Sequence, residues 1–170
     1  MDRPTDKQFA DWHSRLFVTA LRMTGDYDAA GDLAQEAMLK ACRNWHRFDA
    51  RNLPTTWLHS ILVNCVRDWR RRQAVRSSEP LEEWTLVPAA NSTDQPVRRL
   101  EEQEQLAHLR AAIENLPVTL QATFVAVVMD GFSYQETAEL QSISAGTVAS
   151  RVHEARVRLR AAMLKTFGEA

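Results

Sequence analysis

Apolar residues recur three and four positions apart in every long segment of this chain, the spacing that places side chains on one face of an α-helix. The alternating pattern of a half-buried strand is scarce, and the 170 residues include only 5 glycines and 6 prolines. Both observations predict an all-α fold. A hydrophobic content of 45% beside 25% charged residues indicates a chain that forms a packed core.

The first half of the chain is predicted to begin with two helices. The first covers residues 9–24 and is expected to end at Gly25. The second covers residues 28–45, and Asp26 and Asp28 place acidic groups at its start, where they suit the positive end of the helix dipole. The residues expected in its core are Leu33, Ala37, Ala41 and Trp45.

A third predicted helix, residues 55–72, follows a loop that Pro54 closes. It has two distinct faces, because apolar and polar residues each recur at helical spacing. Its predicted core stripe consists of Trp57, Leu58, Ile61, Leu62, Cys65 and Trp69. Its polar, basic face consists of Ser60, Asn64, Arg67 and Arg71, extended by Arg70, Arg72 and Arg76.

The formal net charge is only −1, but the charge is unevenly distributed along the chain. Residues 1–76 carry 13 Lys/Arg against 9 Asp/Glu, residues 77–105 carry 2 against 7, and residues 106–170 carry 6 of each. A basic part, an acidic part with several prolines and a neutral part predict two helical modules joined by an acidic linker. The predicted boundaries are 1–76, 77–104 and 105–170.

Two helices are predicted at the start of the second module. The first resumes helical periodicity at Leu106 and ends near Pro117, and the second ends at a turn formed by Asp130 and Gly131. The apolar residues that carry this periodicity are Leu106, Leu109, Ile113, Leu116, Leu120, Phe124, Val127 and Val128.

Residues 133–161 are predicted to form two more helices around the turn 141–144. Ser133 and Glu136 have the spacing of a capping box, and Ser144 can cap the second helix. The predicted core residues are Ile143, Val148, Val152, Ala155 and Leu159, and the outward residues are Thr147, Ser150, Arg151, Glu154 and Arg158. A helix-turn-helix presents such residues to a major groove, but spacing alone leaves an amphipathic hairpin with a solvated outer face as an alternative.

Motifs for catalysis or metal binding are weak. Four residues between Asp26 and Asp32 match positions of a calcium loop, but Ala30 and Ala37 stand where two further ligands belong. The five histidines form no ligand-spaced pair among themselves or with a cysteine. Because no glycine-rich phosphate loop or nucleophile elbow is present either, neither an enzyme nor a cofactor is expected.

Several other features have a structural interpretation. Cys42 and Cys65 are predicted to be buried free thiols. Trp45 and His46 could stack on bases beside the basic loop, but a packed tryptophan is preferred. No apolar run approaches the roughly 20 residues of a membrane span, and the N-terminus lacks the apolar core of a signal peptide, so a cytoplasmic protein without membrane insertion is expected.

Taken together, these stretches resemble the small extracytoplasmic-function (ECF) group of bacterial sigma factors, in the sigma-70 family. The family's core-binding helix and its exit are similar to GDYDAAGDLAQEAMLKACRNWHRFD, and its promoter-melting helix is similar to TTWLHSILVNCVRDWRRR. Its C-terminal promoter-binding module is similar to LPVTLQATFVAVVMDGFSYQETAELQSISAGTVASRVHEARVRL. The family pattern GTV-x-SR-x-H-x-AR is intact from Gly146 to Arg156, and the resemblance covers nearly the whole chain.

The resemblance implies a transcription initiation factor that binds RNA polymerase core and reads two promoter elements. Facing the β′ clamp helices of the polymerase would be Asp32, Gln35, Glu36, Leu39 and Arg43. The minus-ten element would be bound by a base-capturing loop with Arg51, Asn52 and Leu53, and along the single strand by Asn64, Arg67 and Arg71. The minus-thirty-five element would be bound by Tyr134, Thr147, Ser150, Arg151, His153, Glu154 and Arg158.

The chain departs from the family pattern at several positions. Gln141 and Ser142 replace a small apolar-plus-glycine turn, Ala149 replaces a lysine, and Glu154 replaces a basic residue. Arginine is also frequent in the family where this chain has Val127 or Val128. Each change removes phosphate affinity, so weak binding of the upstream element by the isolated module is expected.

The resemblance also implies the partners: the polymerase clamp helices and β flap, promoter DNA and an anti-sigma factor, with the acidic linker in the RNA-exit path. Two alternatives remain open at this point, a stand-alone helix-turn-helix regulator and a sigma-like adaptor that no longer reads promoters. The basic run Arg67–Arg72 beside a loop favours the sigma factor over the regulator, because a duplex-only binder needs no single-strand face. The residues that favour the adaptor are Ala149 and Glu154.

Overall fold

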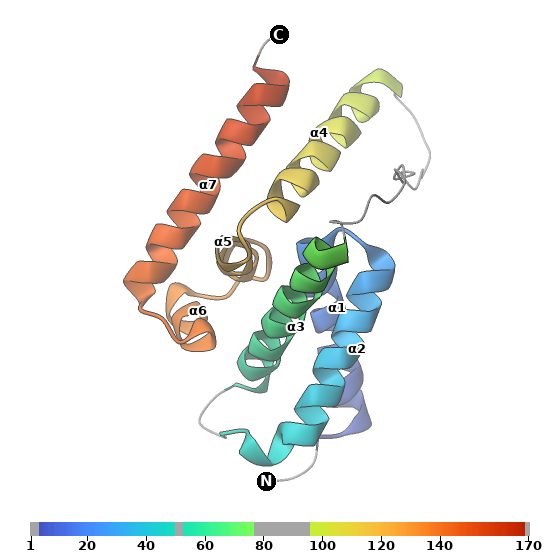
Figure 1. The fold of residues 1–170 in the computed structure, drawn as a ribbon, viewed down its shortest axis with the longest axis vertical. Helices are drawn as coiled ribbons and strands as arrows, with labels where there is room; N and C mark the ends of the chain where they lie inside the picture. Colours follow the sequence, from blue (N-terminus) through green and yellow to red (C-terminus); the bar gives the residue numbers. More distant parts are fainter. Residues whose placement is uncertain (1–3, 50–52, 77–95, 169–170) are drawn as a thin grey trace.

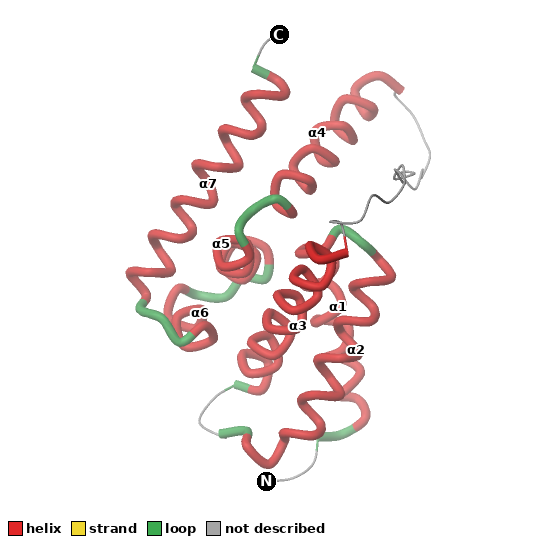
Figure 2. The backbone as a smooth tube through the Cα atoms, viewed as in Figure 1, coloured by secondary structure: helices red, strands yellow, loops and turns green. Residues whose placement is uncertain are grey.

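The computed structural model describes residues 4–49, 53–76 and 96–168. All regular secondary structure in these ranges is helical, which confirms the predicted all-α fold (Figure 2). The first half consists of α1 (Asp6–Thr24), α2 (Tyr27–Asn44), the 3-10 turn η1 (Trp45–Arg47) and α3 (Pro54–Arg76). The second half consists of α4 (Pro96–Glu114), α5 (Val118–Phe124), the π-helical turn η2 (Val125–Met129), α6 (Tyr134–Gln141) and α7 (Ala145–Phe167).

The junction between α1 and α2 forms as predicted. Gly25 ends α1 in the left-handed conformation, with φ of 68°, and its amide donates to the carbonyl of Leu21 at 2.9 Å. A glycine suits this position for a second reason, since an added Cβ would lie 1.8 Å from Oε1 of Glu114. Asp26 then caps α2 by accepting a hydrogen bond from the amide of Ala29 at 3.0 Å.

The stripe of α3 packs into the core largely as predicted. Leu58, Leu62 and Cys65 are buried, whereas Trp57, Ile61 and Trp69 are only partly buried at the edge of the same cluster. Val63 and Val66 are also buried and were not part of the predicted stripe. The core face of α3 is therefore wider than the predicted stripe.

The prediction of two buried thiols is wrong for Cys42, which is exposed, and correct for Cys65. Cys42 follows the buried Ala41 on α2, and one residue turns an α-helix by about 100°, which carries the side chain off the buried face. Burial raises the pKa of the Cys65 thiol, which Lys40 on α2 partly opposes.

Helix α4 begins at Pro96, well before the predicted start near Leu106. Proline suits the first turn of a helix because its φ is already helical and the missing amide has no partner there. The segment from Pro96 to Leu106 carries mostly charged and polar residues, so it lacks the apolar periodicity that indicates a helix in a sequence. Leu106 itself is exposed. Residues 77–95 of the predicted linker lie outside the described residues.

The end of the helix after Pro117 differs from the predicted one. The amide of Asp130 donates to the carbonyl of Val125 at 2.9 Å, the five-residue step of a π-helix. This wider turn shifts the side chains around the axis, so Val125 is buried while Val128 is exposed. Val128 therefore lies outside the core, and Val127 is only partly buried, against a small cluster under α6 and α7.

The two halves are packed against each other along α3 (Figure 1). One continuous buried cluster contains Leu62 and Val66 of α3 together with Leu120 of α5 and Leu159 of α7. Arg70, predicted as part of the basic face, instead donates to the carbonyls of Glu114, Met23 and Leu116, at 2.7, 3.1 and 3.2 Å. Its half-buried side chain therefore ties α3 to the ends of α1 and α4, and burial lowers the pKa of its guanidinium.

Candidate nucleic-acid and polymerase interface

One face of α2 carries all five predicted polymerase contacts. Asp32, Gln35, Leu39 and Arg43 are exposed, and Glu36 is partly exposed. Leu39 is 51% exposed although it is apolar, and it lies between polar neighbours rather than over the core. An exposed leucine flanked by polar residues has the composition of a protein–protein contact surface.

The outer face of α2 is linked to the end of α3 by ion pairs. Glu36 binds Lys40 at 2.7 Å and Arg72 at 3.7 Å. The hydrogen bond that Lys40 donates to Glu36 is the main cause of the raised pKa of Lys40. Arg72 is thereby directed to the α2 face, so the predicted basic run divides into residues with different roles.

Three residues of the predicted single-strand face are exposed on α3. Asn64, Arg67 and Arg71 are exposed, and Arg67 donates to Oδ1 of Asn64 at 3.3 Å. Leu53, just before α3, is 57% exposed. The two other predicted loop residues, Arg51 and Asn52, lie outside the described residues.

Aromatic side chains support the end of this face. Trp45 stacks on Trp12 and Phe48, with ring centroids 5.7 and 5.1 Å apart, and meets Trp57 edge-on at 5.7 Å. The preferred interpretation of Trp45 as a packed residue is therefore confirmed. The cluster packs η1 against α1 and the start of α3.

The second half forms the predicted helix-turn-helix from α6 and α7. Ser133 and Glu136 form the capping box of α6, which lowers the pKa of the Glu136 carboxyl, and Ser144 caps α7 through the amide of Thr147 at 3.1 Å. Ser142 closes the turn in the left-handed conformation, φ 53°, where the family commonly has glycine. The predicted core residues of α7, Val148, Val152, Ala155 and Leu159, are all buried.

The candidate readers on α6 and α7 are not all equally accessible. Ser150, His153, Glu154 and Arg158 are exposed, and Tyr134 is 40% exposed. Thr147 is partly buried and shares a hydrogen bond of 2.9 Å with Ser144. Apart from Tyr134, which begins α6, these positions follow one another along α7, as a recognition helix requires.

Two of the predicted readers have specific partners. Arg158 donates to Oε1 of Glu154 from both Nε and Nη2, at 3.1 and 2.7 Å. Arg151 donates instead to Oε1 of Gln141 at 3.2 Å, so Glu154 is held by Arg158. Oε1 of Gln141 also accepts from Thr123 at 2.8 Å, which fixes the amide in the turn.

The single-strand face and the turn of the helix-turn-helix meet across one cavity of about 350 Å³, called here the α3–turn cavity. Its polar lining comes from both halves and includes Ser60, Asn64, Arg67, Gln141, Ser142 and Arg151. In this arrangement Asn64 and Arg67 of the single-strand face share the cavity with Arg151, a candidate upstream reader. The sequence contained no signal for this, because the residues belong to separate predicted modules.

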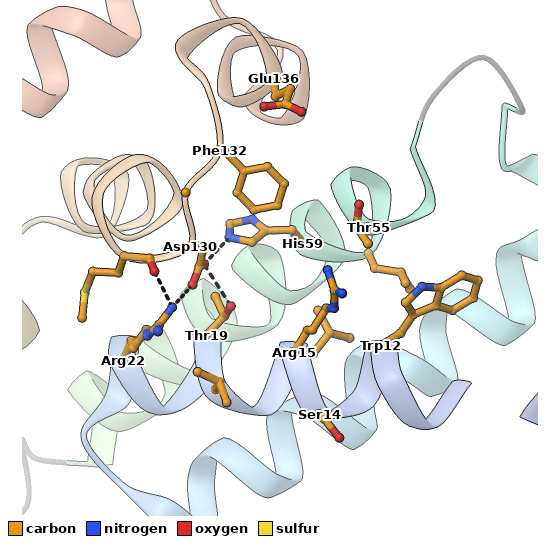
Figure 3. A pocket seen from close by; sticks show the side chains of 15 residues that line it. Trp12, Ser14, Arg15, Thr19, Arg22, Thr55, His59, Asp130, Phe132 and Glu136 are labelled. Carbon is orange, nitrogen blue, oxygen red and sulfur yellow. Dashed lines mark hydrogen bonds and ion pairs between the residues drawn. The ribbon is translucent and has the colours of Figure 1, made fainter. Parts of the chain in front are cut away.

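A second contact between the halves centres on Asp130 (Figure 3). Its carboxylate pairs with Arg22 and accepts a hydrogen bond from Thr19 at 2.9 Å, both on α1. His59 of α3 lies 3.4 Å away, and Arg22 also donates to the carbonyl of Met129 at 2.8 Å. Asp130 was expected only as a turn residue, so its role in holding α1 and α3 was missed.

A cavity of about 600 Å³ adjoins this contact, lined by residues of α1, the start of α3 and the turn before α6. Among the described residues, no group of three or more potential metal ligands is present. In the part of the chain that the structure describes, no helix is long and apolar enough to cross a membrane.

The helical bundle followed by a helix-turn-helix defines a sigma-70-type transcription factor, and two family descriptions match in that order. Sigma-70 region 2 matches residues 9–76, and Sigma-70, region 4 matches residues 106–159. Among curated proteins, the chain is 34% identical over 154 residues to the ECF RNA polymerase sigma factor SigM of Mycobacterium tuberculosis, covering 91% of this chain and 74% of SigM. The chain therefore belongs to the ECF sigma factors of the sigma-70 family, which are promoter-directing initiation factors of RNA polymerase.

Other comparisons agree with this assignment. The chain is 36% identical over 149 residues to the ECF RNA polymerase sigma factor EcfG of Rhodopseudomonas palustris, covering 86% of this chain and 77% of EcfG. Among solved structures it shares its fold with the sigma factor RpoE in complex with the anti-sigma factor NepR from Bartonella quintana. The TM-score is 0.69 at 23% identity, over 95% of this chain and 96% of that one.

Proposed function

We propose that the α2 face formed by Asp32, Gln35, Glu36, Leu39 and Arg43 docks on the clamp helices of RNA polymerase core. The observation that carries this proposal is the exposed Leu39, held between polar side chains on a helix whose opposite side is fully buried. A leucine that becomes buried in a contact contributes about 1.5–3 kcal/mol through its apolar surface, while the surrounding charges define the partner.

In the bound state, α3 would read the minus-ten element as a single strand. Asn64 offers both an acceptor and a donor to an unpaired base, and Arg67 and Arg71 supply charge for the backbone. A loop containing Arg51, Asn52 and Leu53 would capture a flipped base at the upstream end of this face. The strand would follow the exposed side of α3 away from the aromatic cluster.

The recognition helix α7 would read the minus-thirty-five element in the major groove. Tyr134, Ser150 and Arg151 begin the contact surface, and Glu154 and Arg158 continue it along the helix. Few cations are available for phosphate contacts, since Ala149 and Glu154 occupy positions that are basic in many relatives. Specificity would therefore depend on polymerase, which tethers α7 to the same DNA as α3.

We further propose two modules, 1–76 and 105–170, with an acidic linker between them that follows the RNA-exit path. The second module would contact the polymerase β flap. An anti-sigma factor would control access to polymerase, as the complexes of structural relatives suggest for this fold. The protein would act in the cytoplasm, where polymerase and promoter DNA are, and as a binding factor rather than an enzyme.

A binding titration with purified core polymerase tests the α2 assignment. The fluorescently labelled protein should bind core tightly, and Leu39→Arg should weaken that binding at least about tenfold, as expected for a central contact residue. Leu106→Arg is the matched control, because Leu106 is similarly exposed, on α4. Equal affinity of Leu39→Arg and wild type would refute the assignment, and failure of wild type to bind core would refute the function.

A further inference from the structure

The α3–turn cavity has an unusual charge for a site between two parts of one chain. Arg67 enters it from α3 and Arg151 from α7. Among its lining residues, all of which the structure describes, there is no aspartate or glutamate. Each guanidinium has an uncharged partner, Asn64 for Arg67 and Gln141 for Arg151, at 3.3 and 3.2 Å. Two like charges therefore share one cavity without a compensating carboxylate.

The turn supplies a further donor. Nε2 of Gln141 is buried and has no hydrogen-bond partner in the structure, while Oε1 of the same amide accepts from both Arg151 and Thr123. A buried polar group without a partner costs free energy, and a site that leaves one commonly binds a group that satisfies it. All three features, two cations and one free amide donor, call for the same kind of partner, an anion with several acceptor oxygens.

We propose that the α3–turn cavity is a binding site for a compact phosphate-bearing anion, and that its occupation holds the two DNA-binding surfaces together. Guanidinium groups bind phosphate oxygens through paired donors, and the bond is stronger in a partly desolvated cavity than in water. A volume of about 350 Å³ is at the small end of ligand sites and has room for a phosphate or pyrophosphate group. The ligand would neutralise the repulsion between Arg67 and Arg151.

This site has a regulatory consequence. We have proposed that DNA is contacted by Asn64, Arg67 and Arg151. An anion bound between these residues therefore competes with promoter DNA. It also stabilises the arrangement in which the two halves of the chain are packed together across the cavity. The competition between the anion and DNA depends on the proposed function. The proposal of an anion site depends only on the residues of the cavity. A ligand that binds only this packed arrangement stabilises it by a free energy that grows with the logarithm of the ligand concentration above the dissociation constant.

The test uses the full chain and two probes, inorganic phosphate and pyrophosphate, titrated by calorimetry at low ionic strength. Saturable binding of pyrophosphate at one site is expected. Arg67→Gln and Arg151→Gln should each weaken it about tenfold or more, the effect of losing a charge-assisted contact. Arg156→Gln is the matched control, because it removes the same charge from an exposed position of α7 that does not line the cavity. Equal loss in all three variants would reveal non-specific attraction and overturn the proposal.

A second experiment distinguishes the two possible natural sources of the bound phosphate group, a free anion and the backbone of DNA. A single-stranded oligonucleotide should bind the free protein and be displaced by pyrophosphate, with the displacement lost in Gln141→Leu, which removes the amide donor. If the oligonucleotide binds but pyrophosphate neither binds nor displaces it, the arginines are DNA contacts only, and the anion site is refuted. Transcription with core polymerase depends on neither of these two binding experiments. The proposed function and the proposed anion site can therefore be refuted separately.

Discussion

Arg70 of α3 and Gln121 of α5 donate hydrogen bonds to the same oxygen, the carbonyl of Met23, at 3.1 and 2.8 Å. Gln121 also donates to the carbonyl of Ile113 at 3.0 Å and is fully buried. Because these carbonyls lie at or near the ends of α1 and α4, the two side chains satisfy helix ends that would otherwise be unpaired. The halves of the protein are therefore joined by directional contacts as well as by the apolar core.

The first prediction concerns Arg70. Replacing it by methionine keeps the aliphatic stem but leaves the carbonyls of Glu114 and Leu116 without this donor, so the free energy of unfolding should fall by about 1.5–3 kcal/mol. Arg71→Met removes the same charge from the exposed neighbour and should change stability by about 0.5 kcal/mol or less. Urea unfolding of the two variants measures the difference. Similar losses would mean that Arg70 has no special role at the junction.

The second prediction concerns pH. Burial raises the pKa of the Glu114 carboxyl above its ordinary value, although Arg70 and Arg110 partly oppose the shift. The folded state thus favours the protonated acid, and this stabilisation is complete below the unfolded pKa and lost as pH rises through the folded one. Glu114→Gln should therefore be more stable than wild type at neutral pH and similar to it near pH 4.

Unfolding free energies of Glu114→Gln and wild type across this pH range provide the measurement. Glu104→Gln serves as the control, since Glu104 is exposed on the same helix and its replacement should give a pH profile parallel to wild type. A stability difference between Glu114→Gln and wild type that does not vary with pH would contradict the argument.

The third prediction concerns Asn64. Because its side chain is exposed on α3, Asn64→Ala should change the free energy of unfolding by about 0.5 kcal/mol or less. It should nevertheless reduce discrimination at one minus-ten position by about 1–3 kcal/mol, the value of a side-chain pairing with a base edge. Holoenzyme binding to a library of single-stranded minus-ten sequences measures this. Asn115→Ala, at the exposed end of α4, should leave the preference intact, and a preference unchanged in Asn64→Ala would refute the role.

The fourth prediction concerns Glu154. Arg158 holds one carboxylate oxygen of Glu154 and leaves the other to accept a hydrogen bond from the N4 amino group of a cytosine. Glu154→Ala should lose the preference for cytosine at one minus-thirty-five position, while the other positions keep theirs. Selection from a randomised upstream element by holoenzyme measures it, with Glu139→Ala on α6 as the control. Tighter binding to every sequence would show instead that Glu154 only repels phosphate.

The features predicted from the sequence are those that short segments determine. Gly25, Asp26, Ser133 and Ser144 act within one or two turns of their own helices, so their capping roles follow from local spacing. The buried stripe of α7 follows from its period for the same reason. Trp69 was expected in the core but is only partly buried at its edge, because periodicity shows which face a residue is on and not how far the neighbouring helices cover it.

The features that were missed depend on contacts between distant segments. Arg70 looks like its neighbours in the sequence, and only the carbonyls of α1 and α4 distinguish it. Asp130 was expected as a turn residue because its partners, Thr19, Arg22 and His59, lie more than 70 positions away along the chain. The π-helical turn from Val125 to Met129 was not predicted either, because apolar periodicity does not distinguish one wide turn from the rest of a helix.

Run-off transcription with purified core polymerase over a library of genomic fragments tests whether the protein directs polymerase to specific promoters. We expect discrete transcripts that appear only when the protein is added. These transcripts should be strongly reduced with Leu39→Arg but not with Leu106→Arg. The free protein should meanwhile bind duplex promoter DNA only weakly at physiological salt. Transcription no different from that of core alone, together with tight sequence-specific binding by the free protein, would contradict the account.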